Sequence, residues 1–402
     1  MIKLAYCGIP YTSGVYTVYR LLRQGLITHN IDLRWVGLAQ PNTKLEQDFA
    51  SEINSGEFVY FQEDDCQTTK KFVEHIEANY DGIIFNVLAG VIQTNAARFL
   101  SNQILKLQIV HNITPATYRA AHSIRDHVHA TVCVSPRIEN DLVKSMGFMH
   151  QQTITIPNAV DVSKFQEYFA QRTDDEPIKL LSLGRVEDAA KGILWLPDIL
   201  QTCLKKGLQA TLTVAGDGPD LPKLKQKIHK LRLESHTQFI GKVNYIDVPQ
   251  IFASHHALLM PSRYEGFGYT ITESMASGCI PVCSEIKGVT DFIVSNGKDG
   301  YLFPVGNIQK AAESIAKLED RQHWQELSDR AKGVSNSRFN LNQQSEDYAK
   351  LIYQLKAELP TLSPTLSMDD WAIPSGLKSS LSVYLPNNVK NILRLIKERL
   401  RK

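Results

Sequence analysis

The stretch PSRYEGFGYTITESMASGCIPV occupies residues 261–282 of a 402-residue chain and carries its densest structural signal. An apolar run at 257–260 precedes it, a glycine-bearing turn follows, and helix-forming residues begin near Tyr269. This order predicts a strand, a loop and a helix, with free amides at the helix N-terminus that suit an anion. Glu265 in the turn and Glu273 in the helix are then held by different parts of one strand-loop-helix unit.

Short apolar runs alternate with amphipathic stretches on both sides of this unit, a pattern typical of parallel α/β sheets. The runs lie at 2–7, 33–38, 58–61, 82–88, 107–110 and 131–134, and again at 179–183, 210–215, 257–260, 280–283 and 301–303. A polar stretch at 166–177 without apolar periodicity predicts a linker. The predicted fold class is α/β, with doubly wound domains at 1–165 and 178–342. Ligands bind outside the carboxyl ends of such strands, so we expect a substrate cleft between two facing sheets.

The C-terminal part of the chain has three predicted segments. A helix at 343–358 is expected to pack back on the N-terminal domain, and a proline- and serine-containing extended tail begins at 359. Within the tail, residues 388–402 space apolar side chains at helical intervals among lysines and arginines, which predicts a basic amphipathic helix. Contact with an anionic membrane surface and packing against the N-terminal domain are both open for this helix.

The composition of the chain limits the classes of function that it can have. A hydrophobic content of 43% suffices for two buried cores, and a net charge of +2 gives no reason to expect nucleic-acid binding. Six cysteines without a CxxC pair favour a reducing cytosol. The apolar run at 2–7 is too short for a signal peptide or a membrane span. We therefore expect a cytoplasmic protein, with peripheral attachment to the inner face of the plasma membrane as the option raised by 388–402.

A pair of cations follows another predicted strand. Arg185 and Lys191 come just after the apolar run at 179–183, where two positive side chains suit a diphosphate. Taken alone, Glu265 and Glu273 could be a solvated loop acid and an ordinary helix charge. The nearby cations favour a ligand site.

With these motifs in order, the chain closely resembles glycosyltransferase family 4, the group 1 glycosyl transferases, which are retaining enzymes with the two-domain GT-B fold. The resemblance covers nearly all of residues 1–350. It rests on IPNAVD at 156–161, LGR at 183–185 with KG at 191–192, VAGDGP at 214–219, FIGKV at 239–243 and the two glutamates, Glu265 and Glu273.

The resemblance implies roles for individual residues of the second domain. Arg185 and Lys191 would bind the donor pyrophosphate and stabilise its charge as the sugar departs, so no metal or other cofactor is expected. Glu265 would contact the donor sugar, and Glu273 would accept the ribose hydroxyls. The remaining donor-binding residues implied by the resemblance are Val243, Gly266, Phe267, Gly268 and Tyr269.

Two residues of the first domain complete the set implied by the resemblance. Gly14 would approach the donor through its backbone, although a plain tight turn also explains its position. His111 would contact the donor sugar near the reacting carbon, and a structural histidine at a strand end is the alternative. The family often has Asp at the next position, where this chain has Asn112.

The implied activity is retaining, metal-independent transfer of a sugar from a UDP- or GDP-sugar to a glycan or lipid-linked acceptor in surface polysaccharide or glycoconjugate synthesis. The departing phosphate would take the acceptor proton. The alternatives are an epimerase or phosphorylase of the same fold, and a non-catalytic nucleotide-sugar-binding subunit.

Other motifs carry weaker signals. The acidic run at 63–65 lacks the Asp-x-Asp spacing of a metal motif, and the His127/His129 and His255/His256 pairs lack partner ligands. Residues 216–219 lack the spacing of a dinucleotide-binding loop. We expect these segments to be structural.

Overall fold

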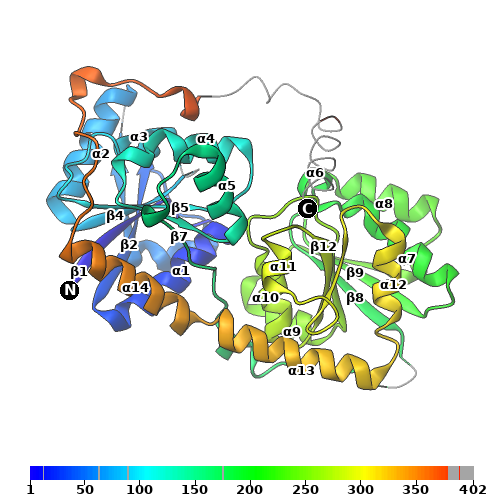
Figure 1. The fold of residues 1–402 in the computed structure, drawn as a ribbon. Helices are drawn as coiled ribbons and strands as arrows, with labels where there is room; N and C mark the ends of the chain where they lie inside the picture. Colours follow the sequence, from blue (N-terminus) through cyan, green and yellow to red (C-terminus); the bar gives the residue numbers. More distant parts are fainter. Residues whose placement is uncertain (12, 62–63, 88–89, 174–175, 379–388, 390–402) are drawn as a thin grey trace. The chain divides into compact units, whose positions relative to one another are not determined.

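A computed structural model describes the chain except for residues 12, 62–63, 88–89, 174–175, 379–388 and 390–402. Its contacts define two compact units, one formed by Met1–Ala159 with the segment from Leu341, and one formed by Val160–Asn340. Each unit is a parallel sheet with helices on its faces (Figure 1). The predicted class, α/β with two doubly wound sheets, is confirmed.

The sheet of the first unit has the order β3-β2-β1-β4-β5-β6-β7, and all its neighbouring strands are parallel. The chain runs outward from β1 to β3 and then returns to β4 on the other side of β1, so the topological switch point lies between β1 and β4. The strands are β1 (Ile2–Cys7), β2 (Ile31–Ala39), β3 (Gly56–Tyr60), β4 (Gly82–Asn86), β5 (Leu105–Val110), β6 (Ala130–Cys133) and β7 (Thr153–Thr155). The helices are α1 (Gly14–Leu26), α2 (Asp65–Asn79), α3 (Val91–Ala96), α4 (Pro115–Ile124), α5 (Pro136–Met146) and α14 (Leu341–Ala357).

Helix α14 returns to the first unit and packs beside α1 (Figure 1). The two helices approach closely at Gly25, where a Cβ atom would lie 2.5 Å from the Cβ of Ser345. A glycine at this point of α1 therefore permits the contact, because any larger side chain would occupy the space of the facing helix.

An extended strap formed by residues 359–378 crosses α2, α3 and α4. The Leu366 amide donates to the Arg98 carbonyl at 2.9 Å, and the Trp371 indole N–H donates to Thr69 Oγ1 at 2.9 Å. Leu366, Met368 and Trp371 also pack against the buried cluster beneath these helices. The strap thus covers apolar surface of the first unit. The predicted basic helix at 388–402 lies, apart from residue 389, outside the described residues.

The sheet of the second unit has the order β10-β9-β8-β11-β12-β13, again with parallel neighbours. Its strands are β8 (Ile178–Leu183), β9 (Ala210–Ala215), β10 (Thr237–Gly241), β11 (Ala257–Met260), β12 (Ile280–Glu285) and β13 (Tyr301–Pro304). Its helices are α6 (Asp188–Lys191), α7 (Leu196–Lys205), α8 (Leu221–Lys230), α9 (Val248–Ala253), α10 (Tyr269–Ala276), α11 (Thr290–Ile293), α12 (Ile308–Ala316) and α13 (Arg321–Arg338). The stretch at 261–282 therefore follows β11 and forms a loop, α10 and the start of β12.

The boundary between the two units lies between residues 159 and 160. It comes before the domain boundary predicted at residue 165 and the linker predicted at 166–177. The Val160 amide donates to the Phe339 carbonyl at 2.7 Å, and Phe165 is buried in a short 3₁₀ helix, Val162–Phe165, that contacts α10. The Ala170 amide donates to the Ser277 carbonyl at 2.8 Å. Residues 160–170 thus belong to the second unit, because Val160 and Ala170 donate backbone hydrogen bonds to it and Phe165 is buried.

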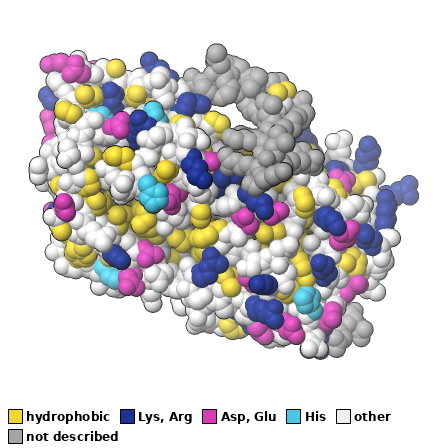
Figure 2. Space-filling model, viewed as in Figure 1, with side chains coloured by type: hydrophobic (Ala, Val, Ile, Leu, Met, Phe, Trp, Pro, Cys, Tyr) yellow, Lys and Arg dark blue, Asp and Glu magenta, His cyan; other side chains and the backbone are white. Residues whose placement is uncertain are grey.

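The distribution of charged side chains and the apolar character of the helices bear on what the described part of the chain can contact. Acidic and basic side chains are interspersed on the face shown in Figure 2, in agreement with the small net charge. Within the ranges that the structure describes, no helix has the length and apolar character needed to cross a bilayer.

Candidate functional site

The loop after β11 is tied to the short helix α6. The Arg263 amide donates to the Ala190 carbonyl at 2.8 Å, and the Arg263 guanidinium donates to the Asp188 carboxylate at 2.7 Å. The same guanidinium lies 3.7 Å from the centre of the Trp195 ring, within cation–π range. These contacts fix the position of residues 261–265 relative to α6.

Lys191 and Glu265 meet at the junction of these two segments. The Lys191 ammonium donates to Glu265 Oε1 at 2.6 Å, and the Ser262 hydroxyl donates to the same oxygen at 2.7 Å. Glu265 is buried, whereas about a third of the Lys191 side chain (35%) is exposed. Two donors therefore orient one carboxylate oxygen, and the Lys191 ammonium has further N–H donors beyond the one that Glu265 accepts.

Arg185 extends from the carboxyl end of β8 with 67% of its side chain exposed. Its Nε lies 3.8 Å from Glu187 Oε2, and such exposed pairs contribute little free energy. Arg185 and Lys191 line one small cavity of about 20 Å³, together with Ser182, Met260 and Thr270. Two predicted phosphate-binding cations thus share a cavity at the carboxyl ends of β8 and β11.

Glu273 lies on α10 and is only 6% exposed. The structure records no hydrogen-bond partner for its carboxyl group among the described residues. Burial raises its pKa to about 8, because removal from water disfavours the charged form. The carboxyl group is therefore mostly protonated at neutral pH in the ligand-free protein, and hydroxyl donors from a ligand would favour its ionised form.

The loop between Glu265 and α10 is buried and has a glycine on each side of Phe267. Phe267 is buried, and its ring packs edge-on against Phe339 with centroids 5.8 Å apart, so its side chain belongs to the core. Gly268 precedes α10 with φ of +99°, a left-handed conformation that favours glycine. Gly266 is buried beside Phe267, and Tyr269 is the first residue of α10.

Val243 lies after a different strand from Arg185 and Lys191. It follows β10, the edge strand of the sheet, and it does not line the cavity that Arg185 and Lys191 share. Strand order explains the difference, because β9 separates β10 from β8.

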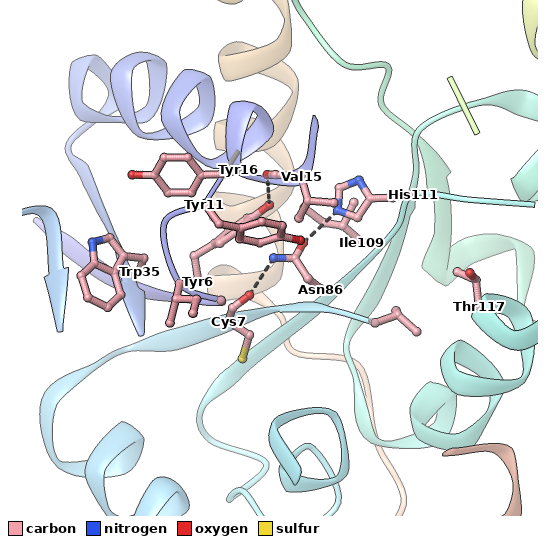
Figure 3. A pocket seen from close by; sticks show the side chains of 13 residues that line it. Tyr6, Cys7, Tyr11, Val15, Tyr16, Trp35, Asn86, Ile109, His111 and Thr117 are labelled. Carbon is pink, nitrogen blue, oxygen red and sulfur yellow. Dashed lines mark hydrogen bonds between the residues drawn. The ribbon is translucent and has the colours of Figure 1, made fainter. Parts of the chain in front are cut away.

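His111 follows β5 in the first unit and is half-buried. Its Nε2 lies 2.8 Å from Asn86 Oδ1, and Asn86 Nδ2 donates to the Cys7 carbonyl at 2.7 Å (Figure 3). Because the carbonyl fixes the Asn86 amide, its oxygen faces His111, and the network assigns the ring proton to Nε2. Burial lowers the His111 pKa to about 4, so at neutral pH the ring is neutral and Nδ1 is an acceptor.

A cavity of about 370 Å³ lies beside His111 in the first unit (Figure 3). Gly14, the first residue of α1, is exposed and does not line this cavity. Ser13 caps α1 by accepting the Tyr16 amide at 3.1 Å, so the local sequence forms a capped helix start. The residues that line the cavity are Tyr6, Cys7, Gly8, Ile9, Tyr11, Val15, Tyr16, Trp35, Asn86, Val87, Ile109, His111 and Thr117.

Asn86, Ser262 and Arg263 were not among the predicted site residues. Asn86 is the polar last residue of an otherwise apolar strand. This polarity was the one feature of the sequence that could have indicated a role in the site. Ser262 and Arg263 stand inside the quoted stretch, but their partners Glu265 and Asp188 are defined only by the folded loop.

One histidine of each pair considered as metal ligands, His129 and His256, accepts a backbone amide. His129 Nδ1 accepts the Lys106 amide at 3.0 Å, and His256 Nδ1 accepts the Lys179 amide at 3.1 Å. In the acidic run at 63–65, Asp64 caps α2 by accepting the Cys66 amide at 2.6 Å. Each contact completes backbone hydrogen bonding at the end of an element.

With this geometry in place, comparison with known proteins defines the class. Residues 163–335 match the family described as Glycosyl transferases group 1. The chain is 24% identical over 183 residues to an alpha-D-kanosaminyltransferase of Streptomyces kanamyceticus, covering 45% of this chain and 47% of that protein. It spans about half the length of the curated relatives it matches.

Two solved structures share the fold across most of the chain. The structure of Anabaena HepE in complex with UDP has a TM-score of 0.74 at 20% identity, covering 88% of this chain and 100% of that one. Sucrose-phosphate synthase from Thermosynechococcus elongatus has a TM-score of 0.73 at 19% identity, covering 89% and 100%. The predicted GT-B fold is confirmed. Residues 163–335 of the second unit match the group 1 glycosyl transferases, in agreement with the resemblance to family 4.

Proposed function

We propose that this protein is a retaining glycosyltransferase that takes a sugar from a nucleoside diphosphate and transfers it to a glycan or lipid-linked acceptor. One observation carries the proposal: within a group 1 domain, Arg185, Lys191 and Glu265 converge at the carboxyl ends of β8 and β11. Relatives named as glycosyltransferases support the transferase class, and a structural neighbour solved with UDP supports the donor class.

In this proposal the donor pyrophosphate binds the two cations. Arg185 and the exposed part of Lys191 neutralise the charge that develops on the departing phosphate, which removes the need for a divalent metal. The backbone of Gly266, Gly268 and Tyr269 approaches the sugar and distal phosphate, and Phe267 anchors that loop in the core.

The two glutamates bind the two ends of the donor. Glu265, with Oε1 held by Lys191 and Ser262, contacts the sugar. Glu273 accepts the ribose hydroxyls, and their hydrogen bonds stabilise its carboxylate form. Gly14, His111 and Val243 remain proposed donor contacts.

The proposed reaction preserves the anomeric configuration. The departing phosphate takes the proton of the acceptor hydroxyl while that hydroxyl attacks the same face of the sugar, so the protein contributes orientation and charge stabilisation. We place the reaction in surface polysaccharide or glycoconjugate synthesis in the cytoplasm, with residues 388–402 as the proposed contact to an anionic membrane surface.

Thermal unfolding with a panel of nucleoside diphosphates and their sugars tests the proposal. A donor that binds only the folded state raises the melting temperature in proportion to the logarithm of its concentration. We expect one nucleotide, UDP or GDP, to stabilise the protein equally with and without EDTA. Lys191→Ala should remove this stabilisation.

Lys206→Ala is the matched control, because Lys206 is an exposed lysine at the end of α7 in the same unit. It should retain the full stabilisation. Failure of every nucleotide to stabilise the wild-type protein would contradict the proposal. Stabilisation without release of nucleoside diphosphate from any donor would instead favour a non-catalytic binding subunit.

A further inference from the structure

The cavity beside His111 lies at the topological switch point of the first sheet. Tyr6 and Cys7 come from β1, Asn86 and Val87 from the end of β4, and these strands are neighbours although β2 and β3 lie between them in sequence. Open α/β sheets bind ligands at this position, outside the carboxyl ends of the strands. The volume of about 370 Å³ is that of a pocket for a small ligand or ligand moiety.

Most polar atoms in the cavity wall have hydrogen-bond partners within the protein, and the buried Tyr16 hydroxyl is an exception among the described residues. The Tyr6 hydroxyl donates to the Val15 carbonyl at 3.2 Å, and the Trp35 indole N–H donates to the Glu52 carbonyl at 2.9 Å. Asn86 uses its amide nitrogen on Cys7 and its oxygen on His111. The wall therefore offers a ligand mainly aromatic rings and aliphatic side chains.

Large apolar side chains also stand exposed at the rim. Tyr11 is 45% exposed and Ile9 is 39% exposed, and both belong to the segment between β1 and α1 that lines the cavity. Apolar surface left in water is unfavourable by about 25 cal/mol per Å², so a ligand that covers these side chains gains affinity. His111, which follows β5 and is the proposed contact to the donor sugar, also lines the cavity, so a ligand bound there lies beside that proposed contact.

We infer that this cavity binds the apolar aglycone of the acceptor, an alkyl or aromatic group linked to a hydroxyl-bearing sugar. The assignment of this ligand as acceptor rests on the proposed function. The preference for an apolar group rests on the side chains that line the cavity, because an unsubstituted polar sugar would find few free donors and acceptors there.

Isothermal titration with three β-D-glucopyranosides tests the inference. Methyl, octyl and 4-nitrophenyl glucoside share one sugar and differ only in the aglycone, and octyl glucoside is used below its micelle threshold. We expect at least one apolar glucoside to bind the full-length protein about tenfold more tightly than the methyl compound, the gain from burying roughly 55 Å² of apolar surface. A preference for octyl assigns an alkyl aglycone, and a preference for 4-nitrophenyl assigns an aromatic one.

Tyr11→Ser and Tyr60→Ser form a matched pair of variants. Both tyrosines are about half exposed, so neither substitution opens the core, and Tyr60 does not line the cavity. Tyr11→Ser should weaken binding of the preferred glucoside about tenfold, and Tyr60→Ser should leave it unchanged. Equal affinity for all three glucosides, or an equal loss in both variants, overturns the inference.

Nucleotide binding separates this inference from the proposed function. If a nucleotide stabilises the protein but no aglycone preference exists, the inference fails alone. If the aglycone preference and its loss in Tyr11→Ser are present while no nucleotide stabilises the protein, the cavity assignment stands and the glycosyltransferase proposal fails.

Discussion

Replacing Glu273 with Gln should make the ligand-free protein less sensitive to pH. Burial raises the Glu273 pKa from its ordinary 4.5 to about 8, so the native state holds a proton that the unfolded chain releases. A carboxyl group with a raised pKa destabilises the fold as pH rises from 4.5 to 8, by about 1.4 kcal/mol per pH unit. Between pH 5.0 and 7.5, wild type should lose about 3 kcal/mol relative to Glu273→Gln.

Thermal unfolding of both proteins at these two pH values measures the difference. For a unit of this size, about 3 kcal/mol corresponds to roughly 6–12 °C in melting temperature. Because the comparison is a change with pH, a constant cost of burying the glutamine amide cancels. Glu319→Gln, an exposed control in the same unit, should track wild type. Parallel pH profiles for wild type and Glu273→Gln would refute the reasoning.

Three further perturbations test other parts of the structure. Asn86→Leu removes the acceptor that fixes the His111 tautomer, so activity should fall about tenfold or more and the Nε2 proton signal in the histidine region of the NMR spectrum should shift or vanish. Gly25→Leu should destabilise the first unit by about 1–3 kcal/mol in urea unfolding, because its Cβ would lie 2.5 Å from Ser345 Cβ. Burial lowers the Lys106 pKa to about 8, so wild type should gain about 3 kcal/mol relative to Lys106→Met between pH 8 and 10.5, measured by thermal unfolding.

Much of the fold was predictable because its signals are local. The apolar runs at 257–260 and 280–283 coincide with β11 and most of β12, and the glycine turn before Tyr269 leads into α10. Arg185 and Lys191 were predicted neighbours because both follow β8. Such features depend on periodicity and on the rule that parallel strands end at one edge.

Other features depend on contacts between distant segments. The bond from Ser262 and Lys191 to one oxygen of Glu265 requires the loop after β11 to fold against α6, which Arg263 secures through Asp188 and Trp195. Sequence spacing contains no signal for such pairs. The hydrogen bond from the Val160 amide to the Phe339 carbonyl likewise joins the two ends of the second unit. It places the start of this unit before the boundary predicted at residue 165.

The apolar cavity illustrates the same limit. Tyr6, Trp35 and Ile109 lie in apolar runs that were predicted as strands, but the space that the lining encloses beside His111 follows from strand order. The pairing of β1 with β4 places Tyr6 and Asn86 together, and no local motif encodes that neighbourhood.

Release of nucleoside diphosphate from a panel of nucleotide sugars, with EDTA present, tests the central claim most directly. The account predicts that wild type releases one nucleoside diphosphate, that Lys191→Ala releases it at least about a hundredfold more slowly, and that Lys206→Ala matches wild type. Absence of release from every UDP- and GDP-sugar, with and without the apolar glucosides as acceptors, would contradict the claim that this protein transfers a sugar from a nucleotide.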